Sequence, residues 1–335
     1  MPHPAAENRG LICAFALAPF SPRGEEVLDQ PLAPGPRPGD EGETAPLWLH
    51  LNLTDARARL WLSKGSGLPD EARAHLLSSD PRSYVEVLPE GVVAVLGDLD
   101  HDFHQGHEGF GALRLYFDGR QVISGRRHPL KGVDLLRRKV QAHAPGIETP
   151  IALVEALIEC LAINFEAVVV NLSGEVDDAE EQILAGHFHD QGKALGRMRR
   201  SLARLRRLIS ADRAALAPLP RRLPSSYSAS EREGLRQAVE RLEAVGQDLE
   251  LVQERARLLQ EEIDGRLTEA TNRNLFLLSV VTTTLLPITL ITGVFGMNVG
   301  GLPWVKHDSG FWWVLLLMVI AVVVTLAFLR RRRVL

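Results

Sequence analysis

The chain has 335 residues, of which 45% are hydrophobic and 24% charged, and its formal net charge is −4. This balance provides no bulk basic field, so no nucleic-acid partner is expected from composition. The two cysteines, Cys13 and Cys160, are too few for a disulfide framework or a thiolate metal cluster. The N-terminus lacks the basic start and long apolar core of a signal peptide, which predicts a cytoplasmic N-terminal part.

Residues 1–145 are predicted to form a cytoplasmic α/β domain. Short apolar runs rich in β-branched and aromatic residues predict strands over 11–17, 47–53, 84–88, 92–96 and 113–117. Asp118 and Gly119 follow the last run and predict a hairpin into Val122 and Ile123. The stretch 21–46 is rich in Pro and Gly and is expected to be a loop. Helices are predicted over 54–64, with Thr54 as N-cap, and over 130–143. No phosphate-binding glycine loop, HExxH or nucleophile elbow occurs, so no enzyme is predicted.

A histidine-rich stretch lies within this domain. His101, His104 and His107 alternate with carboxylates between 98 and 108. Three imidazoles with a neighbouring carboxylate form a ligand set that zinc accepts. The alternative interpretation is a solvated polar loop that joins two strands.

Residues 146–273 are predicted to form a helical stalk or funnel. Apolar residues recur every three or four positions from Leu235 to Leu267 without an interrupting proline and lead directly into the first apolar stretch. A helix over 231–295 would be about 100 Å long at 1.5 Å per residue. Such a rod can transmit a cytoplasmic event mechanically.

Two oppositely charged segments precede this helix. Residues 175–183 are acidic and 193–209 are basic. They predict an antiparallel helical hairpin whose opposite charges face each other and solvent. The alternatives are an acidic helix that collects or senses cations, and a basic helix that contacts anionic lipid or nucleic acid.

Residues 274–335 are predicted to form a transmembrane hairpin with a basic cytoplasmic tail. The first span covers about 275–296, the loop 297–310 and the second span about 311–329; each span is uncharged and long enough to cross roughly 30 Å of hydrocarbon. Two buried helices of a soluble core would need a domain that surrounds both. Arginines precede the first span and follow the second, which predicts that both termini are cytoplasmic.

The first span carries small and weakly polar residues along one face. Steps of three and four residues from Asn272 reach Leu275, Ser279, Thr282, Leu286, Thr289, Gly293 and Gly296. In lipid, such residues serve either helix packing or a wetted lumen. One hairpin cannot enclose a pore, so a conduction path along this face requires several copies of the chain.

The first span ends in the sequence GVFGMNVGGLPW, with Gly296, Met297 and Asn298 at the helix end and Gly300 and Gly301 in the loop. This motif between two terminal spans resembles the signature of the CorA superfamily of metal-ion transporters. The Gly-Gly-x-Pro run and the segment WLHLNL at 48–53 are most similar to its ZntB zinc-transporter branch.

The resemblance implies a homopentamer with a cytoplasmic funnel, in which the first spans line the pore and the second spans form an outer ring. It implies a ring of Asn298 amides at the external mouth and a ring of Asn272 amides near the cytoplasmic entrance. Amide oxygens can hold a divalent ion through its water shell. The alternative role of Asn298 is a helix C-terminal cap.

The external loop departs from the acidic loops usual in magnesium-type members of the superfamily. It carries Lys306, His307 and Asp308, so a lysine ring would repel cations unless Asp308 pairs with it. His307 is a ligand type that zinc prefers, although a lone histidine is also an ordinary polar loop residue.

The sequence therefore predicts a bacterial inner-membrane homopentamer that contacts lipid and moves Zn²⁺ and related ions, among them Co²⁺, Ni²⁺, Cd²⁺ and Mg²⁺, without a bound cofactor. The resemblance further implies proton-coupled uptake, although neither span contains a titratable group. The alternatives are a Mg²⁺ or Co²⁺ channel of CorA type and a membrane-anchored sensor or scaffold that conducts nothing.

Overall fold

The computed structural model describes residues 10–17, 20–22, 46–100, 109–186, 191–297, 302–303 and 309–331. The chain forms two compact units that meet between Leu259 and Gln260. The strands of the first unit are β1 (Leu11–Leu17), β2 (Phe20–Pro22), β3 (Leu47–Asn52), β4 (Tyr84–Leu88), β5 (Gly91–Leu99), β6 (Phe110–Phe117) and β7 (Gln121–Arg126). Its helices are α1 (Ala56–Lys64), α2 (Asp70–Leu77), α3 (Lys131–Gln141), α4 (Pro150–Leu184), α5 (Gln191–Leu216), α6 (Leu219–Arg222) and the first part of α7 (Ala229–Phe295).

The seven strands form one sheet in the order β2-β1-β3-β7-β6-β5-β4. All neighbouring pairs whose direction is given are antiparallel except β3 and β7, which run parallel with Asn52 opposite Arg126. The predicted strands and the hairpin at Asp118 are all present. Two elements were not predicted from sequence: β2, which falls partly in the predicted loop over 21–46, and helix α2.

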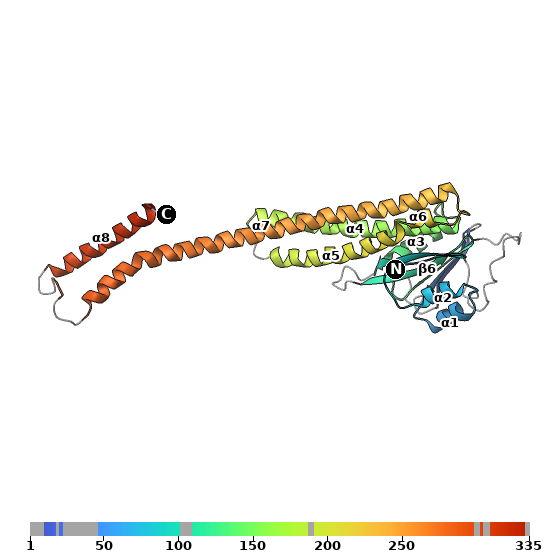
Figure 1. Ribbon diagram of the computed structural model, residues 1–335, viewed down its shortest axis with the longest axis horizontal. Helices are drawn as coiled ribbons and strands as arrows, with labels where there is room; N and C mark the ends of the chain where they lie inside the picture. Colours follow the sequence, from blue (N-terminus) through green and yellow to red (C-terminus); the bar gives the residue numbers. More distant parts are fainter. Residues whose placement is uncertain are drawn as a thin grey trace. The chain divides into compact units, whose positions relative to one another are not determined.

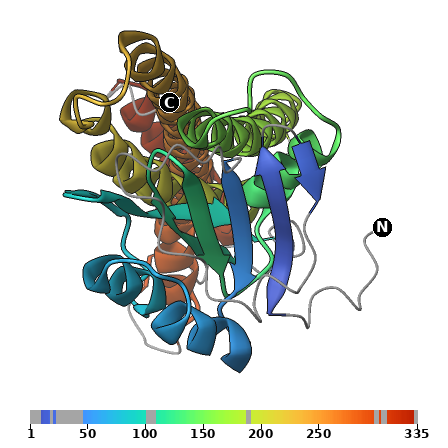
Figure 2. The ribbon, with the colours of Figure 1, turned by 90° about the vertical axis from the view of Figure 1, so that its right-hand side faces the viewer.

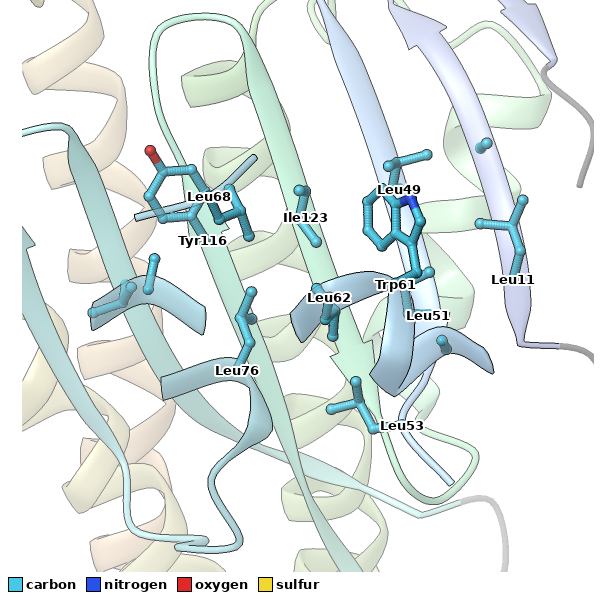
Figure 3. Close-up of a cluster of buried hydrophobic side chains, with 14 of the residues drawn as sticks. Leu11, Leu49, Leu51, Leu53, Trp61, Leu62, Leu68, Leu76, Tyr116 and Ile123 are labelled. Atoms are coloured by element: carbon cyan, nitrogen blue, oxygen red, sulfur yellow. The ribbon is translucent and has the colours of Figure 1, made fainter. Parts of the chain in front are cut away.

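Helices α1 and α2 cover one face of the sheet (Figure 2). Figure 3 shows the apolar cluster beneath them, where Trp61 and Leu62 of α1 lie against Leu49 and Ile123 of the sheet. Side chains alternate between the two faces of a strand, so the residues between these positions point to the opposite face of the sheet. The prediction of Thr54 as N-cap was wrong by one residue. The cap is Asp55, whose carboxylate accepts from the N–H groups of Arg57 and Ala58.

The other face of the sheet contacts helices α3, α4 and α5. Helix α4 begins at Pro150, after the Thr149 side chain that caps it, and α7 extends without a break over 67 residues (Figure 1). The apolar seam predicted on α7 is buried from Leu235 to Ile263, and Leu267 at its end is half-buried.

Helices α4 and α5 lie side by side, as the predicted hairpin requires, and charges of both also pair with α7, which was not predicted. Asp177 and Glu180 of α4 pair with Arg255 of α7, at 2.6 and 2.9 Å. On the basic helix α5, Arg206 pairs with Glu250 and Arg213 with Glu243, and both glutamates belong to α7. At these positions α7 therefore supplies the opposite charge to both segments.

Two buried carboxylates connect the sheet to its helices. Asp98 of β5 accepts hydrogen bonds from the N–H groups of Gly132 and Val133 at the start of α3. Asp212 of α5 accepts one from Gly97 N at 2.8 Å. Burial raises the pKa of each carboxyl to about 7. Each acid therefore titrates near neutral pH while it holds β5 to a helix.

The second unit contains the C-terminal part of α7 and helix α8 (Gly310–Arg331). Both helices have an apolar stretch of membrane-spanning length and composition, and none of that stretch is buried within the chain. Within these apolar stretches, the side chains are consequently not covered by the rest of the chain.

Candidate functional site

An open groove of about 790 Å³ follows α7 within the apolar stretch. The described residues that line it form two rows with a spacing of four: Val281, Leu285, Thr289, Gly293 and Met297, and beside them Thr282, Leu286, Leu290 and Val294. Residues four apart share one face of a helix. The groove therefore lies on one continuous side of α7.

The threonine hydroxyls of this groove hydrogen-bond to their own helix. Thr282 Oγ1 donates to the carbonyl of Leu278 at 2.8 Å, and Thr289 Oγ1 donates to that of Leu285 at 3.0 Å. A hydroxyl has one proton and two lone pairs, so a hydroxyl that donates to the backbone keeps its acceptor capacity. Each oxygen can therefore accept a hydrogen bond from a water molecule in a cation's hydration shell.

Helix α7 ends at Phe295, next to Gly296, as the sequence predicts. Gly296 N donates to Thr292 O at 2.8 Å, and a Cβ added at Gly296 would lie 2.9 Å from the same oxygen. A larger residue at this position would require the helix end to shift. Met297 follows and is 54% exposed, so the last described residue before Asn298 stands open.

Pro287 interrupts the hydrogen-bond pattern inside the groove segment. Proline has no N–H, so the carbonyl of Thr283, one turn earlier, receives no helical hydrogen bond. In the hydrocarbon region such a carbonyl is tolerated where a neighbouring helix or water reaches it.

The groove brings together part of the residue set predicted from sequence. Thr282, Leu286, Thr289 and Met297 line it, whereas Gly296 lies just beyond α7 and Asn272 is exposed on α7 before the apolar stretch. Sequence reasoning missed the apolar members Val281, Leu285, Leu290 and Val294. Their spacing of four was visible, but apolar residues at this spacing do not by themselves distinguish a groove from a lipid-facing surface.

Several predicted site residues lie outside the described residues. They are Asn298, Gly300, Gly301, Lys306, His307 and Asp308 after α7, and His101, His104 and His107 in the α/β unit. Within the part of the chain that the structure describes, no group of three His, Cys, Asp or Glu residues is placed to hold a metal ion. The roles of all these residues stay predictions.

Comparison with known proteins supports the architecture. Over 269 residues the chain is 31% identical to the "Divalent cation transporter CmaX" of Pseudomonas aeruginosa, covering 79% of this chain and 80% of that protein. Over 266 residues it is 27% identical to the "Zinc transport protein ZntB" of Pectobacterium atrosepticum, covering 79% and 81%.

Solved structures give the same result for the whole fold. The full-length CmaX structure matches with a TM-score of 0.79 at 28% identity, covering 97% of this chain and 98% of that one. The CorA magnesium transporter of Methanocaldococcus jannaschii matches with a TM-score of 0.77 at 18% identity, covering 95% and 97%, which shows a shared fold. The family model described as "CorA-like Mg2+ transporter protein" matches residues 43–331. The α/β unit, the long helix α7 and the two apolar C-terminal helices thus identify the chain as a member of the CorA family of divalent-cation transporters.

Proposed function

We propose that the chain carries Zn²⁺ across the bacterial inner membrane along the groove face of α7. The observation that carries this proposal is the pair of hydroxyls, Thr282 and Thr289, which keep their acceptor capacity on a face of an uncharged helix segment. Oxygen acceptors without a fixed charge suit an ion that keeps its water shell, because they do not bind it too tightly to leave. The relatives named as zinc transport proteins support zinc as the cargo.

The proposed pathway needs several copies of the chain around an axis. Leu286 and Leu290 in the groove are each 64% exposed in the single chain, and a lumen requires walls on all sides. We propose a homopentamer in which α7 lines the pore and α8 faces lipid, with Asn298 at the outer mouth and Asn272 at the cytoplasmic entrance. Arg330 and Arg331 at the end of α8 favour a cytoplasmic C-terminus.

A Mg²⁺ or Co²⁺ channel is the second candidate. It is favoured by the description of the family model and by the fold shared with a magnesium transporter. It is less favoured because the outer loop carries Lys306 and lacks the run of acidic residues usual in magnesium-type members of the superfamily. Zinc can also use His307 as a ligand, which magnesium does not prefer.

The decisive experiment is Zn²⁺ flux into liposomes that contain the full chain and a zinc-sensitive dye. We expect saturable flux that Asn298→Ala abolishes, and faster flux when a proton gradient points in the direction of transport. Equal flux with and without the gradient would remove proton coupling. Larger flux of Mg²⁺ than of Zn²⁺ from the same liposomes would favour the channel. Absence of flux for every divalent ion tested, from verified pentamers, would contradict the transport proposal.

A further inference from the structure

A polar pocket of about 200 Å³ lies in the first unit, where strands β3 and β7 end. Asn52 closes β3 and Arg126 closes β7, and the two residues face each other across this parallel pair. Thr54, Arg127 and His128 complete its polar wall. In doubly wound α/β sheets, ligands bind at the carboxyl ends of the parallel strands, and this pocket lies at the same end of the one parallel pair in the described sheet.

Counted over the described residues, the charges around this pocket do not balance. The Arg126 side chain is only 7% exposed, and its Nη1 lies 3.4 Å from Asp134 Oδ2. Arg137 Nε lies 3.6 Å from the other oxygen of the same carboxylate. Among the described residues, one acid therefore serves two guanidinium groups. A buried charge without full compensation costs free energy, so an anion beside Arg126 would stabilise the site.

Two neighbouring groups, Arg137 and His50, bear on this charge balance. The buried Nε of Arg137 has no hydrogen-bond partner among the described residues. His50 lies next to this site on β3, and burial, followed by the charges of Arg126 and Arg137, lowers its pKa well below the usual value. His50 therefore stays neutral and adds no further charge of its own.

Two side chains of the pocket wall are held in fixed positions by the protein itself. Arg127 Nη2 donates to the carbonyls of Leu77 and Ser78, at 3.3 and 3.1 Å, which anchors this guanidinium. Asn52 Oδ1 accepts from both Thr54 N and Thr54 Oγ1, which orients the amide. No carboxylate is among the described lining residues. Arginine forks match the oxygens of phosphate bidentately.

We propose that this pocket binds a phosphate group, either as free phosphate or as a small phosphomonoester. Its volume lies below the roughly 300–1,000 Å³ of pockets that hold drug-sized ligands, so a nucleotide does not fit the size class. The N–H groups at the start of α3 are not available to the ligand, because those of Gly132 and Val133 already donate hydrogen bonds to Asp98. The site is separate from the α7 groove and does not depend on the transported ion.

The test is isothermal titration calorimetry on the detergent-purified full chain, with sodium phosphate and then glycerol phosphate at constant ionic strength in chloride. We expect saturable binding of at least one of the two. Arg127→Gln and Arg126→Lys should each weaken it about tenfold or more, since the lysine keeps the charge but loses the fork. Arg120→Gln is the matched control, because Arg120 is exposed and directly precedes the opposite end of β7.

Tighter binding of phosphate would support the free anion as ligand, and tighter binding of glycerol phosphate an organic phosphomonoester. Circular dichroism of each variant checks that the fold is intact. The proposal fails if the native chain shows no saturable heat with either probe. It fails equally if Arg127→Gln and Arg120→Gln bind as the native chain does, because the signal would then be general anion binding.

Discussion

The two ends of α7 use the same kind of residue in opposite ways. Near its start, Leu235, Leu242 and Leu249 are completely buried against other parts of the same chain. Near its end, Leu277, Leu285 and Leu290 are all more than half exposed. The first unit completes its own core, whereas the second unit leaves its apolar surface to lipid or to further copies of the chain. One helix thus packs into a protein core at its start and presents an uncovered apolar surface at its end.

The largest expected effect comes from the same substitution made at each end. Leu242→Ala should lower the free energy of unfolding of the first unit by about 2–5 kcal/mol, because it leaves a cavity in a packed core. Leu290→Ala should leave that unfolding transition unchanged, because its side chain is 64% exposed in the chain. Urea unfolding followed by circular dichroism measures both. Equal destabilisation by the two variants would contradict the distinction between a packed start and an uncovered end of α7.

The first unit also differs from the second in its buried titratable groups, Asp98 and Asp212, which make its stability depend on pH. Asp212 has its folded-state pKa raised from 3.8 to about 7, so the folded chain binds the proton more tightly than the unfolded chain does. Its contribution to stability is full below pH 3.8 and is lost as the pH rises through 7.

Asp212→Asn should therefore gain stability relative to the native chain between pH 5 and pH 8. The gain is on the order of 3 kcal/mol, because the native chain loses about 1.4 kcal/mol per pH unit between pH 5 and the folded-state pKa near 7. The amide that replaces the carboxyl keeps an oxygen that can accept from Gly97 N, so the contact itself is retained. Unfolding midpoints at four pH values in this range provide the measurement. Parallel curves for the two proteins would show that Asp212 does not titrate there.

Removing a groove hydroxyl tests the proposed function of the C-terminal, exposed end of α7. Thr289→Val keeps the shape of the side chain but removes the oxygen, and we expect about a tenfold lower initial rate of Zn²⁺ flux, the size of one hydrogen bond. Thr284→Val is the matched control, because Thr284 also donates to its own helix, at 2.8 Å to Val280 O, but does not line the groove. Equal loss in both variants would point to helix packing instead of ion contact.

The smallest expected effect concerns the ion pairs between α4 and α7. Arg255 contacts Asp177 and Glu180, but all three side chains are close to half exposed. Arg255→Ala should cost less than about 1 kcal/mol, because water and salt screen exposed pairs. The difference from the native chain should shrink when unfolding is measured in 0.5 M instead of 0.05 M sodium chloride, at about one third of the screening length. A difference that stays constant would indicate lost packing by the arginine stem.

Sequence patterns predicted those parts of the fold that local chemistry dictates. The apolar run Leu11–Leu17, the Asp118 turn and the helix end beside Gly296 each depend on neighbouring residues, and each is present. Helix α2 was missed because it has only eight residues and begins after Pro69, without a side-chain cap. The ion pairs that both segments make with α7 were missed, because charge complementarity does not decide between α5 and α7, which both lie within reach of α4.

The candidate site was predictable only in part. The threonines of the groove stand out because hydroxyls are rare in an otherwise apolar span. The groove's leucines and valines do not stand out, because the same residues suit a lipid-facing surface. The pocket at Arg126 was not predicted, since it forms from three segments, β1, β3 and the chain after β7, that only the sheet order brings together.

Pro287 gives α7 a place where bending costs little. A helix resists bending through its hydrogen bonds, and kinks form where one of them is already missing. Between Thr283 and Pro287 that bond is absent, and the residues on either side, Thr282 and Thr289, are those whose hydroxyls line the groove. A change of angle at this joint would separate the two oxygens or bring them together. The spacing of the proposed ion contacts at Thr282 and Thr289 would then vary with the bend of the helix.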